Sequence, residues 1–249
     1  MKVKDILDFL EITAPCSTAL EFDNVGLLVG DKDSEVEGVL VSLDCFDEVI
    51  DRAEDLGANL IITHHPIIFS PLKSVTANDL VYKLINKGIS VISMHTNLDI
   101  ANGGVNDALC SALGLYDIDV VEASDGFLLR FGQLDKPEDP YSFARHIKEK
   151  LGGNVKFVAG DHDINSVAVC SGSGGDYIFD AVKFGADALV TADIKHHIFI
   201  EAGRMGISVF DAGHFNTEDV IVAPLCKVLS NKFPDIPVLE CHFSKIENI

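Results

Sequence analysis

The apolar residues of the chain gather in short runs that are separated by longer amphipathic stretches. The segment 39–65 opens on a β-branched run, continues with apolar side chains at helical spacing, stops at Gly57-Ala58 and ends in the apolar run 60–63. A short apolar run on each side of a helix is typical of parallel strands that are covered on both faces. The segment therefore predicts a strand–helix–strand unit of an α/β fold.

Residues 167–193 repeat this pattern in the same order, with Gly185-Ala186 in the place of Gly57-Ala58. A second correspondence follows, because Gly206-Ile207-Ser208-Val209 is identical to Gly88-Ile89-Ser90-Val91. Two corresponding blocks in the same order are the signature of an internal repeat. We therefore expect an α/β protein made of two similar, interlinked lobes.

The boundaries of these lobes follow from the segments around the repeat. The first lobe is expected to span residues 1–124 and the second residues 125–214, with 215–249 as an alternative completion of the first lobe. Further expectations are a helix over 4–13, a strand over 25–29, a candidate lid over 69–78, a linker over 120–126, a strand over 127–134, a helix over 141–151 opened by Pro140, and a helix over 219–229 that starts late or bends at Pro224.

Two adjacent histidines, His64 and His65, follow the apolar run 60–63 and precede Pro66. Proline biases the residue before it towards extended backbone, and neighbouring side chains on extended backbone point to opposite sides. A single ion would not readily take both imidazoles, whereas two ions flanking the strand end could. The pair therefore favours a dinuclear metal site.

A histidine and a carboxylate four residues apart follow the last predicted strand of each repeat, as His95 and Asp99 and again as His214 and Glu218. Proteins of the α/β class place their ligand sites at the carboxyl ends of strands. Two facing lobes would therefore bring both sets into one cleft. The residues that we expect to bind two divalent ions there are His64, His65, Asp99, His214 and Glu218.

The ligand types indicate which ions and which chemistry to expect. Imidazole and carboxylate ligands suit Zn, Fe, Mn, Ni or Co, and five ligands shared by two ions leave coordination positions open for water or substrate. His95 is either a sixth ligand or a group that orients a carboxylate or passes protons. Asp193 and His197, near the repeat position of the histidine pair, are further candidates for such a supporting or proton-transfer role. Asp44 either reaches the cleft or caps the helix that follows it.

Composition narrows the partners and the compartment. The net charge is −20, and no basic run is present, so a nucleic-acid partner is disfavoured. No apolar run approaches the about 18 residues of a membrane span, and Asp5 and Asp8 interrupt any signal-peptide core. The six cysteines are scattered without a C-x-x-C pair, which argues against a thiolate zinc site and against a disulfide framework. We expect a cytoplasmic protein without membrane partners.

Five motifs occur in order along nearly the whole chain: Asp23-Asn24-Val25-Gly26-Leu27, Thr63-His64-His65-Pro66, His95-Thr96-Asn97-Leu98-Asp99, Thr191-Ala192-Asp193, and Gly213-His214 with Glu218. In combination they resemble the GTP cyclohydrolase 1 type 2 homologues, also described as a dinuclear-metal, interacting-factor-like family. The resemblance implies a two-lobed α/β fold, a two-metal site on the same five ligands and a ring-shaped homohexamer. This chain has Thr-Ala-Asp where many members of the family have Thr-Gly-Asp.

Two interpretations of function follow. The first is a metal-dependent hydrolase, similar to GTP cyclohydrolase, whose ions activate a bridging water against a small-molecule substrate such as a nucleotide. The alternative is a metal-handling or metal-insertion protein, or a regulatory scaffold with a dinuclear metal site. Easily exchanged metal without turnover would favour metal handling, and a closed site without an open coordination position would favour the scaffold.

Overall fold

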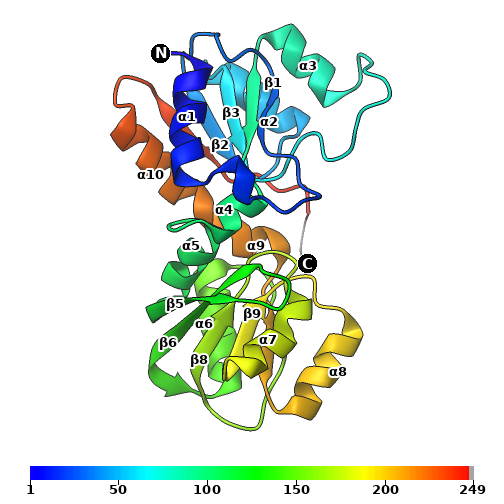
Figure 1. Cartoon of the computed structure of the whole chain (residues 1–249), viewed down its shortest axis with the longest axis vertical. Helices are drawn as coiled ribbons and strands as arrows, with labels where there is room; N and C mark the ends of the chain where they lie inside the picture. Colours follow the sequence, from blue (N-terminus) through cyan, green and yellow to red (C-terminus); the bar gives the residue numbers. More distant parts are fainter. Residues whose placement is uncertain (247–249) are drawn as a thin grey trace. The chain divides into compact units, whose positions relative to one another are not determined.

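The computed structural model describes residues 1–246 and divides the chain into two compact units, each built on its own sheet (Figure 1). The first unit comprises Met1–Asn102 together with Val222–Lys245, and the second comprises Gly103–Ile221. The chain therefore leaves the first unit after Asn102 and returns to it at Val222. The expectation of a mixed α/β fold with two sheets is confirmed.

The sheet of the first unit has the strand order β1 (Gly26–Val29), β4 (Ser90–Ser93), β3 (Leu60–Thr63), β2 (Val39–Ser42) and β11 (Val238–Cys241). Strands β4, β3, β2 and β11 run parallel, and β1 pairs antiparallel with β4 at one edge. The helical elements of this unit are α1 (Val3–Thr13), η1 (Cys16–Thr18), α2 (Asp47–Asp55), α3 (Leu80–Lys87), α4 (Thr96–Ile100) and α10 (Val222–Lys232).

The sheet of the second unit has the strand order β5 (Tyr116–Glu122), β6 (Leu128–Glu138), β8 (Ile164–Val169), β9 (Ala188–Thr191), β10 (Ser208–Asp211) and β7 (Lys156–Val158). Strands β8, β9 and β10 run parallel, while β5, β6 and β7 pair antiparallel with their neighbours. The helical elements are α5 (Val105–Leu113), α6 (Pro140–Leu151), η2 (Gly175–Tyr177), α7 (Ile178–Lys183), α8 (His196–Met205), α9 (His214–Glu218) and η3 (Asp219–Ile221).

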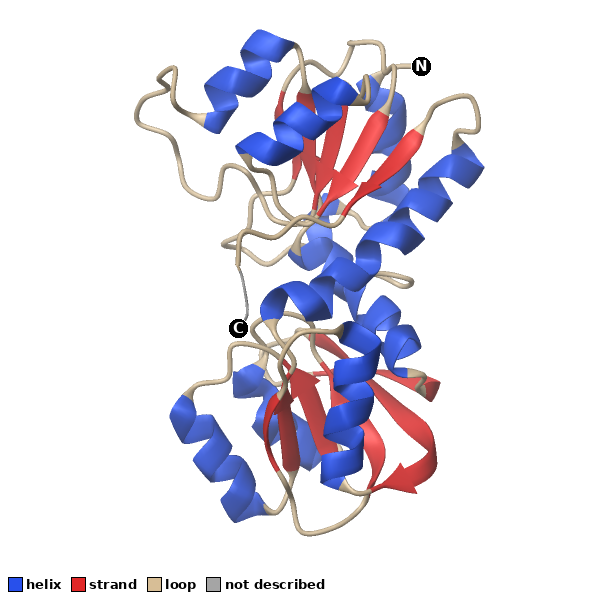
Figure 2. Cartoon of the chain, turned by 180° about the vertical axis from the view of Figure 1, so that it is seen from behind, coloured by secondary structure: helices blue, strands red, loops and turns tan. Residues whose placement is uncertain are grey.

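Helices cover both faces of each sheet (Figure 2), and the central strands are buried accordingly. Every residue of β2, β3, β4 and β9 is buried, which explains why these strands read as continuous apolar runs rather than as alternating ones. Leu60, Ile61 and Ile62 are fully buried in β3, and each such side chain contributes about 1.5–3 kcal/mol by leaving water. The buried strand therefore holds the residues that follow it in a fixed position.

Both units contain the predicted strand–helix–strand order, as β2–α2–β3 and as β8–α7–β9, and in both a further helix leads to a third parallel strand. The predicted helix 4–13 corresponds to α1, the strand 25–29 to β1, the strand 127–134 to β6 and the helix 141–151 to α6. The helix expected over 219–229 starts late, as α10 at Val222, because the preceding residues form η3. Pro224 thus lies in the first turn, where its missing N–H breaks no helical hydrogen bond.

Two expectations differ from the structure. Residues 120–126 do not form a linker, because 116–122 are the edge strand β5, whose mostly exposed and partly acidic residues hide the strand pattern. The boundary between the units lies at Asn102 and not at residue 124, because Leu109, Cys110 and Leu113 of α5 belong to the core of the second sheet. The returning segment of the first unit, Val222–Lys245, contains α10 and β11, and β11 pairs with β2.

Candidate metal centre

The adjacent histidines lie just beyond the end of β3, where the backbone bends at both residues. Because of this bend their rings do not point to opposite sides, and the expectation from extended geometry is wrong. The ring centroids of His64 and His65 are 5.1 Å apart with an angle of 44° between the planes. The separation of the two rings is therefore no longer an argument for two ions.

His95 brings a third imidazole to the same place. It lies beyond the end of the neighbouring strand β4 and immediately precedes α4, and its ring centroid is 5.2 Å from that of His64 and 5.5 Å from that of His65. One ring nitrogen from each of the three histidines lies within 4.8 Å of the others. Parallel neighbouring strands thus bring three imidazole nitrogens to one edge of the first sheet.

All three histidines are held through Nδ1. The Nδ1 atom of His64 lies 2.8 Å from the main-chain oxygen of Met94, that of His65 lies 2.8 Å from Asp44 Oδ1, and that of His95 lies 2.9 Å from Asp23 Oδ1. An imidazole that donates its Nδ1 proton to such an acceptor presents Nε2 as the basic nitrogen, which is the usual arrangement of metal-binding histidines.

Two carboxylates hold His65 and His95, and the sequence pattern predicts a role for only one of them, Asp44. Asp44 contacts His65 and makes no capping hydrogen bond to α2, so the predicted capping role is wrong. For Asp23 the sequence predicts only membership of a family motif. The signal that could have found it is a polar pair, Asp23-Asn24, directly before a short apolar strand.

Asp23 is fixed as an anion by its surroundings. Burial by itself would raise the pKa of the Asp23 carboxyl, but hydrogen bonds from His95 and Thr96 outweigh it and hold the pKa well below its usual range. Thr96 donates both its main-chain N–H (3.0 Å) and its hydroxyl (2.5 Å) to Asp23 Oδ2. The carboxylate is thus ionised at neutral pH and orients His95 from a buried position.

Asp99 lies in α4, is buried, and points its carboxylate at His64. The distance from Asp99 Oδ1 to His64 Nε2 is 3.5 Å. Two ligands of one tetrahedral zinc ion, each about 2.0–2.2 Å from the metal, are about 3.3–3.5 Å apart. The donor types and their spacing therefore fit a shared divalent ion on His64 and Asp99.

The second unit holds the other predicted pair on the single short helix α9. His214 Nε2 lies 3.0 Å from Glu218 Oε2, and His214 Nδ1 lies 2.7 Å from Asp193 Oδ2. The hydrogen bond to Glu218, reinforced by Asp193 and opposed by burial, raises the pKa of His214 to about 9. His214 therefore has a carboxylate at Nδ1, as His65 and His95 do, and a second carboxylate near Nε2, as His64 does.

The backbone around Glu218 is shaped to admit its carboxylate. Gly172, in the loop after β8, has a φ of +58°, and a Cβ at this position would collide with Glu218 Oε1. The main-chain N–H of Gly172 donates to Thr217 Oγ1 at 3.1 Å, which ties the loop to α9. Asp193 also has a positive φ, of 52°, which is uncommon for a residue with a side chain and marks a position that the fold has to hold in place.

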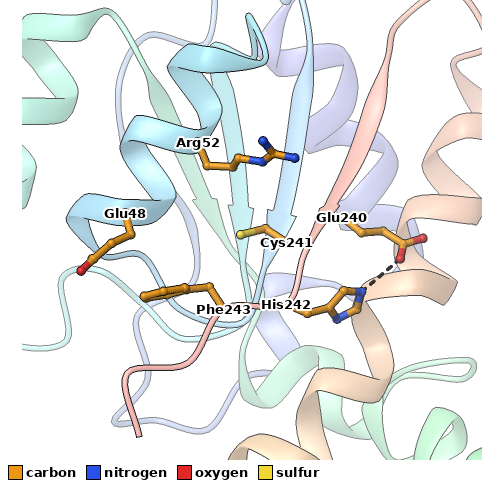
Figure 3. Close-up of a pocket in the computed structure, with 6 residues that line it drawn as sticks. All are labelled: Glu48, Arg52, Glu240, Cys241, His242 and Phe243. Carbon is orange, nitrogen blue, oxygen red and sulfur yellow. Dashed lines mark hydrogen bonds and ion pairs between the residues drawn. The ribbon is translucent and has the colours of Figure 1, made fainter. Parts of the chain in front are cut away.

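Of the two supporting candidates in this unit, only Asp193 contacts a predicted ligand. His197 is exposed on α8, and in the part of the chain that the structure describes no hydrogen bond or ion pair joins it to His214. A cavity of about 330 Å³ lies between α2 and β11 in the first unit (Figure 3). It is separate from the candidate ligands, because its lining consists of Glu48, Arg52, Glu240, Cys241, His242 and Phe243.

Comparison with known proteins places the chain in a family. The sequence profile of Duf34/NIF3 (NGG1p interacting factor 3) matches residues 1–249. The chain belongs to this family. Relatives named GTP cyclohydrolase 1 type 2 homolog include one from Clostridium perfringens, 38% identical with 88% of this chain and 87% of the relative covered, and one from Lactococcus lactis, 37% identical with 86% of each covered.

Solved structures of relatives share the whole fold. A hypothetical protein of Staphylococcus aureus superposes with a TM-score of 0.93 at 34% identity, covering 100% of this chain and 99% of that one. Reduced HcgD from Methanocaldococcus jannaschii superposes with a TM-score of 0.83 at 31% identity and 98% coverage of both chains. The resemblance drawn from the five motifs is confirmed.

None of the helices formed by residues 1–246 combines the length and apolar character that a membrane crossing requires.

Proposed function

We propose that His64, His65, Asp99, His214 and Glu218 together bind two divalent metal ions. The observation that carries this proposal is the common support of the histidines. His64, His65 and His214 each have an acceptor at Nδ1, so each presents Nε2 to an ion. A structural histidine at a strand end needs no such repeated arrangement.

The course of the chain supports a single centre. Asp99 lies three residues before Asn102, the last residue of the first unit before the chain leaves it, and Glu218 lies three residues before Ile221, the last residue before the chain returns. Both carboxylates are therefore tied covalently to the two crossing points. The predicted internal repeat, with one histidine–carboxylate pair in each half, gives the same expectation from sequence.

The proposed activity is hydrolysis of a small molecule. Bound divalent ions would supply Lewis acidity and lower the pKa of a coordinated water to near 7. His95 is placed to move a proton, because Asp23 holds its Nδ1 and an imidazole so held can accept a proton at Nε2. Relatives are named GTP cyclohydrolase 1 type 2 homolog, so a nucleotide is the first substrate to assay.

The test is turnover of GTP by zinc-loaded protein beside His95→Gln. Proton transfer by a positioned side chain contributes about 10²- to 10⁴-fold, so His95→Gln should lose about that factor while keeping its metal. Turnover that does not depend on metal would refute the hydrolase proposal. Two ions that pass readily to a chelator, without turnover of any nucleotide, would favour the metal-handling alternative.

The subunit number belongs to the same proposal. We expect the homohexamer that the family resemblance implies, with no membrane or nucleic-acid partner. Sedimentation equilibrium of the metal-loaded protein measures the mass directly. A monomer of 26.9 kDa at micromolar concentration would refute this part of the proposal.

A further inference from the structure

Two phenylalanine side chains are exposed next to the histidine cluster of the first unit. Phe22 is 62% exposed and Phe69 is 53% exposed, and their ring centroids are 6.1 Å apart with an angle of 47° between the planes. We call them the aromatic pair. The two rings contact each other at the surface and leave their remaining aromatic area open to a planar ligand.

The aromatic pair is tied to the histidines through its sequence neighbours. Phe22 precedes Asp23, whose buried carboxylate holds His95 at 2.9 Å. Phe69 follows Ile68, whose main-chain oxygen accepts a 2.6 Å hydrogen bond from the Asn24 side chain. The two loops that carry the rings are thus joined to each other, and one of them is joined to the histidine cluster.

The loop of Phe22 is also fixed from its other side. The main-chain N–H of Leu20 donates to Thr96 Oγ1 at 3.0 Å, and the hydroxyl of Thr96 donates in turn to Asp23. Residue 22 therefore lies between two anchors on the first turn of α4. The backbone that carries Phe22 is therefore held before a ligand binds, which lowers the ordering cost of binding.

The exposed area suits a small ligand better than a protein partner. A phenylalanine side chain offers about 150–250 Å², so the two exposed fractions leave roughly 200 Å² of aromatic surface. A stable protein interface takes about 800 Å² from each partner. The loop that carries Phe69 runs on into α3 (Figure 1).

We propose that the aromatic pair binds a planar ring of the substrate, so that the metal-dependent reaction acts on a ring-bearing compound and Phe22 and Phe69 determine its specificity. This inference rests on the proposed function, because it makes the aromatic pair the wall of the same site. An aromatic side chain can stack on any of the nucleic-acid bases, because every planar ring offers a π-face. Removing one ring should weaken binding by about 5- to 150-fold.

The chain has no tryptophan, so Phe22→Trp and Phe69→Trp each introduce a single fluorescent reporter. Full-length, zinc-loaded protein is titrated with GMP, CMP and nicotinamide mononucleotide, and with ribose 5-phosphate, which has the sugar and phosphate without the ring. We expect saturable quenching by at least one ring compound and none by ribose 5-phosphate. Phe22→Leu and Phe69→Leu should lower the affinity for that compound, and Phe179→Leu, which removes a 55% exposed ring from α7, should not.

The outcomes separate this inference from the proposed function. Equal responses to ring compounds and ribose 5-phosphate, or no response to any ring compound, would overturn the inference while leaving metal-dependent hydrolysis intact. Ring-dependent binding without turnover would overturn the hydrolase proposal and leave the ring-binding surface. A tryptophan signal that changes with protein concentration alone, together with a change of mass in Phe22→Leu, would show an interface between copies and refute ring binding.

Discussion

Gly172 offers a sharp test of the role of Glu218, because a Cβ added at this position of positive φ would meet the Glu218 carboxylate first, with His214 Cε1 next at 3.4 Å. Gly172→Ala has two effects that can be separated. The left-handed backbone costs a residue with a Cβ about 1–2 kcal/mol. The new Cβ also collides with Glu218 Oε1 and displaces the carboxylate, whereas backbone strain by itself does not.

Gly185→Ala is the matched control, since Gly185 has a φ of +80° in the same unit and an added Cβ would meet nothing within 4 Å. Urea unfolding of the metal-free proteins should show a loss of about 1–2 kcal/mol in both variants. Misplacing a group that supports a metal site costs about 10- to 100-fold in affinity, so only Gly172→Ala should weaken zinc binding by that factor in competition with a fluorescent chelator. Zinc affinities of the two variants within threefold of each other would refute the reasoning.

Two further predictions concern the histidine partners. Asp23→Asn removes the anion that holds His95, so turnover should fall about 10- to 100-fold while the thermal unfolding temperature of the zinc-loaded protein changes little; unchanged turnover would contradict this. In the folded, metal-free protein the pKa of His214 is raised from 6.5 to about 9. Protonation of His214 therefore stabilises the folded state fully below pH 6.5, and this stabilisation is lost as the pH rises through 9. NMR of the imidazole protons should show this titration in the metal-free protein. Its midpoint should move to lower pH in Glu218→Gln, and the titration should be absent when zinc is bound.

The sequence was sufficient for the core of the fold because the central strands are buried on both faces and read as continuous apolar runs. It failed at β5, whose residues are nearly all exposed and show no apolar alternation, and at the boundary between the units, which depends on where α5 packs. Both errors concern tertiary contacts that local spacing does not encode.

The candidate ligands were predictable for the same reason that the strands were. His64, His65, His95 and Asp99 follow strand ends, and the parallel register of β3 and β4 brings those ends together. The bend that turns the rings of His64 and His65 towards each other was not predictable, since Pro66 restricts His65 without fixing the direction of the chain. The role of Asp23 depends on a hydrogen bond across 72 positions, which no motif spacing reveals.

Zinc content of the gel-filtered protein tests the central claim most directly. The account predicts two ions per chain in the natural protein and a lower content in both Asp99→Asn and Glu218→Gln, because each substitution removes a ligand from a different unit. A single ion per chain, or a zinc content in Glu218→Gln equal to that of the natural protein, would contradict a centre shared by the two sets of ligands.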